Sequence, residues 1–199
     1  MVLCLTPTCR VFGQIHDRFG DVCPSLQNAS PPDLLQFLNG VVPDEKNGWC
    51  TTWAIYRLGD EHYEPAIAAL VKLLDFRRPP TQQEKMGFYL HAQSIQEVFP
   101  AALALAVIGR PALPEVLRAM QTTSTSARAR ENAVSVWMEA YKYERPKGIA
   151  LLKQEEAKAN NDTTKQNLRW AVQKALTHCG LPGEKEGTSC RQAAATAVP

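Results

Sequence analysis

The stretch AIYRLGD (residues 54–60), followed by PAIAAL (65–70), decides the fold. It recurs as LALAVIG (103–109), followed by LPEVL (113–117). In each copy an apolar segment ends in Leu-Gly or Ile-Gly, a short turn follows, and a proline lies at the start of a second apolar segment. Glycine ends helices because it adopts positive φ at no steric cost, and proline is tolerated in a first helical turn. The two copies therefore predict two α-helical hairpins.

A weaker third copy lies nearer the C-terminus. It begins near Arg130, continues through AVSVW (133–137) and ends in GIALLK (148–153), while WAV (170–172) matches the start of a fourth copy. The tryptophans of these two copies are 33 residues apart, within the period of about 33 to 47 residues found in helical repeats. Pro146 is expected to open the partner of the helix that precedes it.

The repeated unit resembles the HEAT repeat, including the phycobilisome-lyase-type HEAT-like form common in bacteria. The resemblance covers about residues 47–179 and implies an all-α fold, a short α-solenoid of stacked helical hairpins. In such proteins each hairpin buries its apolar face against its neighbours. Because the first two copies are separated by more than one repeat, residues 79–99 are expected to insert an extra helix, which argues against a smooth superhelix.

The chain divides into three parts by composition. Residues 1–46 are rich in proline and glycine, which predicts an irregular N-terminal arm. One short helix is expected within the arm, capped by Ser30 and ending at Gly40, with leucines on one face. Residues 47–179 form the expected repeat domain, and residues 180–199 have the composition of a flexible tail.

Local signals place the helices of the repeat domain. Aromatic residues at helical spacing predict a helix over residues 47–59, after which Asp60 is expected to cap the next helix. Thr81 begins a capping-box pattern and predicts a helix that continues to Pro100. A further helix is expected to start at Pro100 and to end at Gly109, in the left-handed conformation that glycine tolerates.

Composition places the chain among ordinary globular proteins, with 45% hydrophobic and 21% charged residues. The net charge of +2 gives no strong field that would attract nucleic acid. The richest apolar stretch, 101–108, is much shorter than the roughly 20 residues of a transmembrane helix, and the first residues lack the apolar region of a signal peptide. We therefore expect a soluble protein without a membrane partner, with a cytoplasmic location slightly favoured over export.

Five of the six cysteines lie towards the chain ends, and two hypotheses about them stay open. In an oxidising compartment, at least one disulfide is expected among them, within the N-terminal arm; in the cytosol all would be reduced thiols. Cys50, beside Trp49 on a helix, is expected to stay a buried thiol. The candidate disulfide cysteines are Cys4, Cys9, Cys23, Cys179 and Cys190.

Residues that could carry catalysis have simpler explanations. The sequence DEH at 60–62 gathers two carboxylates and an imidazole, as in general acid–base sites, but helix capping accounts for the same residue types. His16, with a cysteine seven residues to either side, lacks the tight pair of ligands typical of zinc sites. No nucleophile, zinc-protease or nucleotide-binding motif is present. We therefore predict no catalytic residue, no metal site and no cofactor.

The candidate binding residues lie near the third and fourth copies. Trp170 falls on the helix face opposite the apolar stripe, which suits an exposed anchor, although packing beneath the C-terminal tail is an equal alternative. Basic residues at helix ends could align along one edge, as HEAT-like DNA glycosylases use them, or could simply be solvated. The candidates are Trp170, Gln173, Lys174, Arg128 and Arg130.

Together these features favour a non-enzymatic protein-binding module or assembly scaffold, with another protein as its partner. The alternative is a HEAT-like enzyme or a nucleic-acid-binding protein that uses a basic groove. The balanced charge disfavours nucleic acid, and stacked helices offer the extended surface that a protein partner needs.

Overall fold

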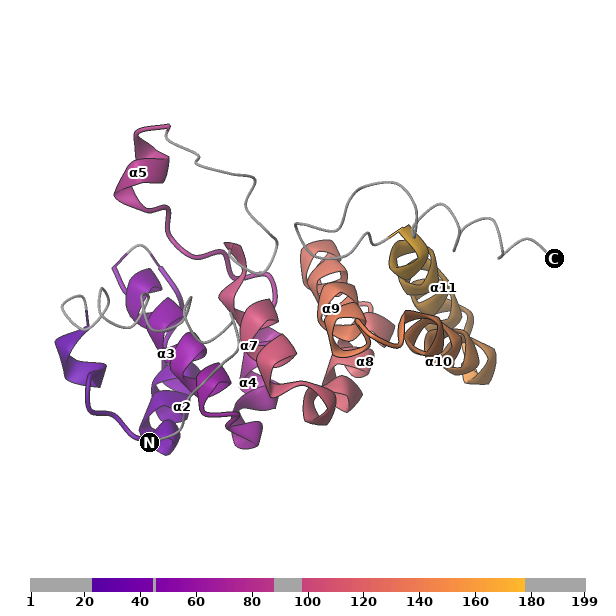
Figure 1. Cartoon of the computed structure of the whole chain (residues 1–199), viewed down its shortest axis with the longest axis horizontal. Coiled ribbons are helices and arrows are strands. Elements are labelled where there is room, and N and C mark those ends of the chain that lie inside the picture. The colour runs from indigo at the N-terminus through magenta and orange to yellow at the C-terminus, as the bar shows by residue number, and fades with distance from the viewer. Residues whose placement is uncertain (1–22, 45, 88–97, 178–199) are drawn as a thin grey trace.

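The computed structural model describes residues 23–44, 46–87 and 98–177, and over these residues its regular elements are all helices (Figure 1). The expected all-α class is therefore confirmed for this part of the chain. In chain order the elements are the 3-10 turn η1 (Pro24–Leu26), α2 (Pro31–Gly40), α3 (Gly48–Asp60), η2 (Glu64–Ala66), α4 (Ile67–Lys72), α5 (Gln82–Lys85), α7 (Pro100–Ile108), η3 (Arg110–Ala112), α8 (Leu113–Gln121), α9 (Ala127–Ala140), α10 (Arg145–Lys158) and α11 (Asp162–Thr177).

Helix α2 begins and ends where the sequence signals place it. The Ser30 backbone N–H donates to the Asp33 carboxylate over 3.1 Å, and the Ser30 hydroxyl donates to the same carboxylate. These two bonds lower the pKa of Asp33. Pro31 occupies the first turn, where no backbone donor is needed, and Leu34 and Leu38 are buried. The prediction of a short helix in the arm is confirmed.

Gly109 ends α7, as the sequence predicts. Its backbone N–H donates to the Leu105 carbonyl over 2.9 Å, and its φ is +79°. Positive φ is the region that favours glycine. The ψ of −137° lies outside the left-handed helical region that was expected, because the chain extends here before it enters η3.

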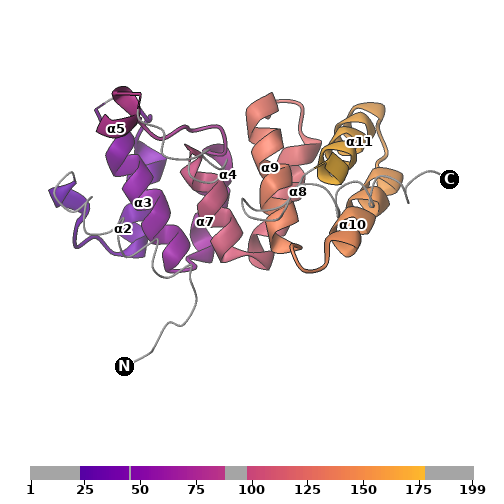
Figure 2. The ribbon, with the colours of Figure 1, turned by 45° about the horizontal axis from the view of Figure 1, so that its top comes forward.

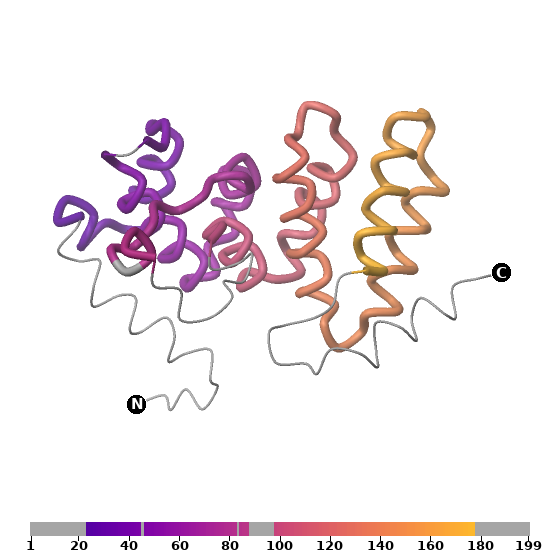
Figure 3. The backbone as a smooth tube through the Cα atoms, turned by 90° about the horizontal axis from the view of Figure 1, so that it is seen from above, coloured from indigo at the N-terminus to yellow at the C-terminus, as the bar shows by residue number. Residues whose placement is uncertain are grey.

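The helices form an elongated row that runs from α2 and α3 at one end to α10 and α11 at the other (Figures 1 and 3). Helix α2 packs on α3, α3 on α7, and α7 on α9, while α4 packs on α7 and α8. Helix α11 packs on α8 and α9. Helix α9 therefore packs mainly on α7, α8 and α11, and not on α10, the next helix in the chain.

Helix α10 packs chiefly on α11 rather than on α9, which corrects the pairing expected for the third hairpin. Helix α9 meets α10 near the turn between them, where Trp137 Nε1 donates to the Gly148 carbonyl over 3.0 Å. The two helices differ in how many residues they bury. Helix α10 buries Gly148 and Leu152, whereas α11 buries four residues along one face, which are Leu168, Ala171, Val172 and Ala175.

One hydrophobic core runs along the row. It includes Leu58 on α3, Leu70 on α4 and Leu105 on α7, each with no exposed surface. Helices α3 and α7 lie close together at Gly59, where an added Cβ would lie 2.8 Å from both Cα and Cβ of Ala104. Packed interiors do not tolerate such a contact. The glycine that marks the repeat in the sequence is therefore also required by the packing of α3 on α7.

The helix expected from Thr81 to Pro100 is not continuous. The Glu84 backbone N–H donates to Thr81 Oγ1, which confirms the capping box. Helix α5 nevertheless ends at Lys85, and Gly87 follows with a φ of +78°, which interrupts helical geometry. Residues 88–97 lie outside the described residues.

The start of α4 also differs from the expectation. Asp60 is the last residue of α3 rather than the cap of the next helix, because Glu61 N–H still donates to the Arg57 carbonyl over 3.0 Å. Helix α4 instead begins after the 3-10 turn η2, which contains Pro65. Proline suits this turn because it presets φ and lacks an N–H.

Half of the expected arm, residues 1–22 and 45, and all of the expected tail, residues 180–199, lie outside the described residues. Among the described helices, none alone is long and apolar enough to cross a membrane; α7 together with the segment Arg110–Gln121 passes that test as a pair bent by 112°.

Candidate functional site

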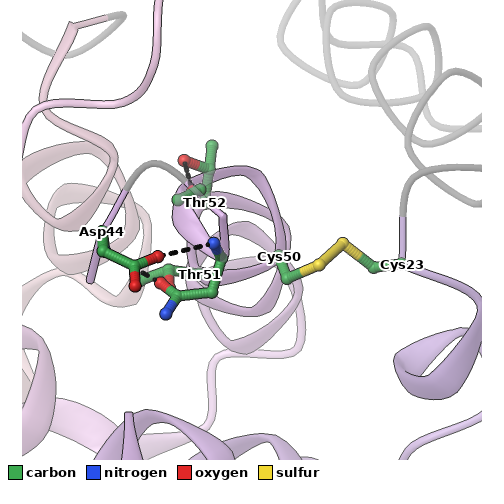
Figure 4. The surroundings of a disulfide bond; sticks show 7 residues. Cys23, Asp44, Cys50, Thr51 and Thr52 are labelled. Atoms are coloured by element: carbon green, nitrogen blue, oxygen red, sulfur yellow. Dashed lines mark hydrogen bonds between the residues drawn. A yellow bond between two sulfur atoms is a disulfide. The ribbon is translucent and has the colours of Figure 1, made fainter. Parts of the chain in front are cut away.

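A disulfide joins Cys23 to Cys50 in the first turn of α3 (Figure 4). The two Cα atoms are 5.5 Å apart, although 27 positions separate the residues in sequence. The expectation that Cys50 stays a free thiol is wrong, because the chain around η1 lies beside the start of α3 and brings Cys23 within bonding distance. The other four cysteines expected to form disulfides lie outside the described residues: Cys4, Cys9, Cys179 and Cys190.

The loop before α3 is closed by two polar side chains. The Asp44 carboxylate, shown in Figure 4, accepts the backbone N–H groups of Lys46 over 2.8 Å and Asn47 over 2.9 Å. The Asn47 amide in turn donates to the Val42 carbonyl over 3.0 Å. These bonds fix the entry of the chain into α3 and orient its first turn.

A groove of about 750 Å³ lies where the first turn of α3, the segment after α4 and helix α5 meet. Figure 1 shows α5 standing away from the row, above the end that carries α2 and α3, and Figure 2 shows it at the same end. Trp49 and Phe76 line the groove, and the extended segment 77–80 (RRPP) runs along it. Volumes of this size are typical of ligand-binding clefts.

Two exposed apolar residues are adjacent in sequence to residues that line the groove. Val42 is 83% exposed and precedes the lining residue Pro43, and Met86 is 65% exposed and follows the lining residue Lys85. Large apolar side chains exposed around a concave surface are typical of an interaction site.

Arg78 holds in place the extended segment 77–80, which forms one wall of the groove. Its guanidinium donates to both oxygens of Glu84, over 2.6 and 2.9 Å, and its backbone N–H donates to the Val98 carbonyl over 3.0 Å. The side chains of Arg78 and Glu84 are only 14% and 12% exposed. Hydrogen bonds from Arg78, together with the N–H of Thr81, lower the pKa of Glu84 to about 2. Glu84 is therefore ionised at neutral pH and neutralises Arg78.

Gly48 allows the wall to approach α3. A Cβ on Gly48 would lie 2.7 Å from Cγ of Pro79, closer than packed atoms allow. The extended segment therefore lies directly on the first turn of α3, next to Trp49.

Trp49 lies in the groove and not in the hydrophobic core, where its helical spacing predicts it. Trp49 and Trp53 lie on the same apolar stripe of the helix expected over residues 47–59, which predicts that both are core residues. Trp53 is buried, but Trp49 is half-buried and lines the groove. The Arg78 guanidinium lies 6.0 Å from the centroid of the Trp49 ring. Trp49 lies in the first turn of α3, where the extended segment rather than another helix covers it. The sequence RRPP at residues 77–80 could have indicated this surface, because consecutive prolines cannot continue a helix and leave an extended segment.

The structure brings most of the predicted binding residues together between α9 and α11. Trp170 is half-buried and packs against the core, with Arg130 and Lys174 at 6.0 and 5.7 Å from its ring centroid. Gln173 is exposed on the same helix. Trp170 is thus covered by two cations and does not stand free as an anchor.

The basic residues of this patch already have partners. Arg128 and Lys174 contact the two oxygens of Glu131, over 3.2 and 3.3 Å, and Arg130 donates to the Asn167 side chain over 3.3 Å. Arg128 also lies over the Phe99 ring, 5.5 Å from its centroid. Part of the positive charge is therefore neutralised within the protein, which weakens the patch as a phosphate-binding edge.

The residues considered for catalysis do not converge. Glu61 pairs with Arg57 over 2.6 Å, Asp60 ends α3, and His62 is exposed with a φ of +49°. Over residues 23–44, 46–87 and 98–177 there is no group of three His, Cys, Asp or Glu side chains that could hold a metal ion. Cys23, part of the cysteine and histidine pattern considered for zinc, is bonded to Cys50.

Comparison with protein-family models, curated proteins and solved structures gave no significant match. The resemblance to HEAT repeats therefore stays a prediction, carried by the residues that suggested it.

Proposed function

We propose that this chain is a non-enzymatic protein-binding module, built as a short stack of HEAT-like helical hairpins, and that the groove beside Trp49 is its binding site. The observation that carries the proposal is this groove of about 750 Å³, bounded by Trp49, Phe76 and prolines. A preformed wall of aromatic and proline residues itself loses little conformational entropy when a ligand binds to it.

The arrangement of the helices supports the scaffold part of the proposal. Helices α3, α7 and α9 pack on one another in turn, and α4 packs beside α8. Successive equivalent helices in contact are expected of stacked hairpins. The disulfide and the Arg78–Glu84 pair add rigidity at the end of the row that carries the groove. A preformed groove requires less ordering when a partner binds.

The test compares two tryptophans that lie in different surfaces. The full-length protein, its Trp49→Ala variant and its Trp170→Ala variant are each used for cross-linked affinity capture from the native source, with quantitative mass spectrometry. Trp49 is not packed on the hydrophobic core, so its removal is expected to leave the fold intact. We expect specific partners of the wild type to be lost with Trp49→Ala and kept with Trp170→Ala.

Two results would contradict the proposal. Loss of the partners with Trp170→Ala alone would assign binding to the patch between α9 and α11. Retention of the partners by both variants would remove the groove as a binding site. Circular dichroism and thermal unfolding of each variant separate loss of binding from loss of fold.

A further inference from the structure

We propose that the groove binds an extended, acidic segment of a partner protein, with an apolar side chain against Trp49 and carboxylates at Arg77 and Lys85. The inference rests on the proposed function and adds the chemistry of the ligand to it. Three observations support it. Two cationic side chains at the groove have no partner among the residues that the structure describes, aromatic surface is open to a ligand, and three consecutive residues of the wall offer no backbone N–H.

Among the groove-lining residues that the structure describes, three are cationic (Arg77, Arg78 and Lys85) and two are anionic (Asp44 and Glu84), so positive charge is in excess. Arg78 and Glu84 pair with each other, and the Asp44 carboxylate accepts two backbone N–H groups of its own loop. Arg77 and Lys85 also line the groove and are exposed, and their side chains form no ion pair or hydrogen bond with any residue that the structure describes. Two cations are therefore available to a ligand, which favours a partner with negative charge.

The apolar surfaces define what accompanies that charge. Trp49 and Phe76 are half-buried in the groove, so each presents part of an aromatic ring to a ligand. Val42 and Met86, adjacent in sequence to the lining residues Pro43 and Lys85, are exposed apolar residues. Aromatic residues in partly enclosed sites contribute disproportionately to binding energy. An apolar side chain of the ligand is therefore expected at Trp49, with acidic residues next to it.

The extended wall directs recognition to side chains. Pro79 and Pro80 have no N–H, and the N–H of Arg78 is bonded to the Val98 carbonyl. Three consecutive residues of the wall thus offer no backbone donor, which disfavours the addition of a ligand as a β-strand. The side chains of Arg77 and Lys85 are the remaining means of recognising the ligand's charge.

The experiment selects peptides from a random displayed library on the oxidised full-length protein. The library holds peptides of about twelve residues, which span roughly 40 Å when extended. Selected peptides are resynthesised with a fluorescent label, and their affinities are measured for the wild type, Trp49→Ala, and the double variant Arg77→Glu/Lys85→Glu. The matched control is Lys153→Glu/Lys165→Glu, which makes the same change of charge at two exposed lysines on α10 and α11.

We expect the selected peptides to be enriched in Asp and Glu beside an aromatic or large aliphatic residue. Charge reversal at Arg77 and Lys85 should weaken binding about tenfold or more, because two favourable charge pairs become repulsive. Trp49→Ala should weaken it by a similar factor. The control variant should bind within about twofold of the wild type, apart from the long-range effect of net charge, which salt screens.

The outcomes separate this inference from the proposed function. Peptides that require Trp49 but are neutral or basic, or that bind equally to the charge-reversed groove, would overturn the acidic ligand and leave the groove as a binding site. The absence of any peptide that requires Trp49 would overturn both. Self-association of the wild type that is lost on charge reversal, measured by analytical ultracentrifugation, would assign the groove to a second copy of the chain and overturn a separate partner.

Discussion

The disulfide between Cys23 and Cys50 gives a stability prediction whose magnitude follows from its place in the chain. It closes a loop over a sequence separation of 27 residues. In the chain-entropy account, a cross-link of this length destabilises the unfolded state by about 3.5 kcal/mol at 25 °C. We therefore expect reduction to lower the free energy of unfolding by about that amount.

The assay is urea unfolding of the oxidised and the reduced full-length protein, followed by circular dichroism. With a slope of about 2 kcal/mol per M, the midpoint should fall by roughly 1.7 M on reduction. Cys23→Ala/Cys50→Ala should resemble the reduced wild type and respond little to reductant, which isolates this disulfide from the other four cysteines. Alanine is suitable because Cys23 is 2% exposed and a polar replacement would be buried.

A midpoint that moves by less than about 0.3 M on reduction would refute this reasoning, since the disulfide would then contribute under about 1 kcal/mol. That result would mean that the segment around η1 unfolds separately from the helices. A double alanine variant that reductant destabilises as strongly as the wild type would assign the effect to the remaining cysteines.

Two further predictions concern packing and pH. Gly59→Ala should destabilise the fold by about 1 to 3 kcal/mol, because the new Cβ meets Ala104 at 2.8 Å in a packed helix interface; the control Gly40→Ala, whose Cβ meets nothing within 4 Å, should stay within about 0.5 kcal/mol or be slightly stabilised. Both are checked by urea unfolding, and equal midpoints for the two variants would argue against close contact of α3 and α7. Because Arg78 lowers the pKa of Glu84 to about 2, the folded state gains stability from Glu84 above its ordinary pKa near 4.5 and loses it as the pH falls towards 2. Glu84→Gln should therefore be less stable than the wild type by about 1 kcal/mol at pH 7, with a difference that shrinks below pH 4.5; a difference independent of pH would contradict this.

Features that depend on a few neighbouring residues could be predicted from the sequence. Ser30 caps α2, Pro100 opens α7 and Gly109 ends it, as their side chains and φ preferences indicate. In each case the bonds that decide the element lie within about four positions along the chain. Such local preferences act before any tertiary contact forms, so they can be identified from residue types alone.

The groove and the cross-link beside it were decided by tertiary structure. Helical spacing placed Trp49 in the core and left Cys50 a free thiol, whereas the fold places Trp49 on a wall and bonds Cys50 to Cys23. Periodicity identifies the face of a helix on which a side chain lies, but not what covers that face along its length. The first turn of α3 is contacted by Cys23 and by the segment 76–80, which are 27 or more positions away from the residues they contact. Their approach depends on how the whole row of helices packs, and local sequence preferences do not determine that packing.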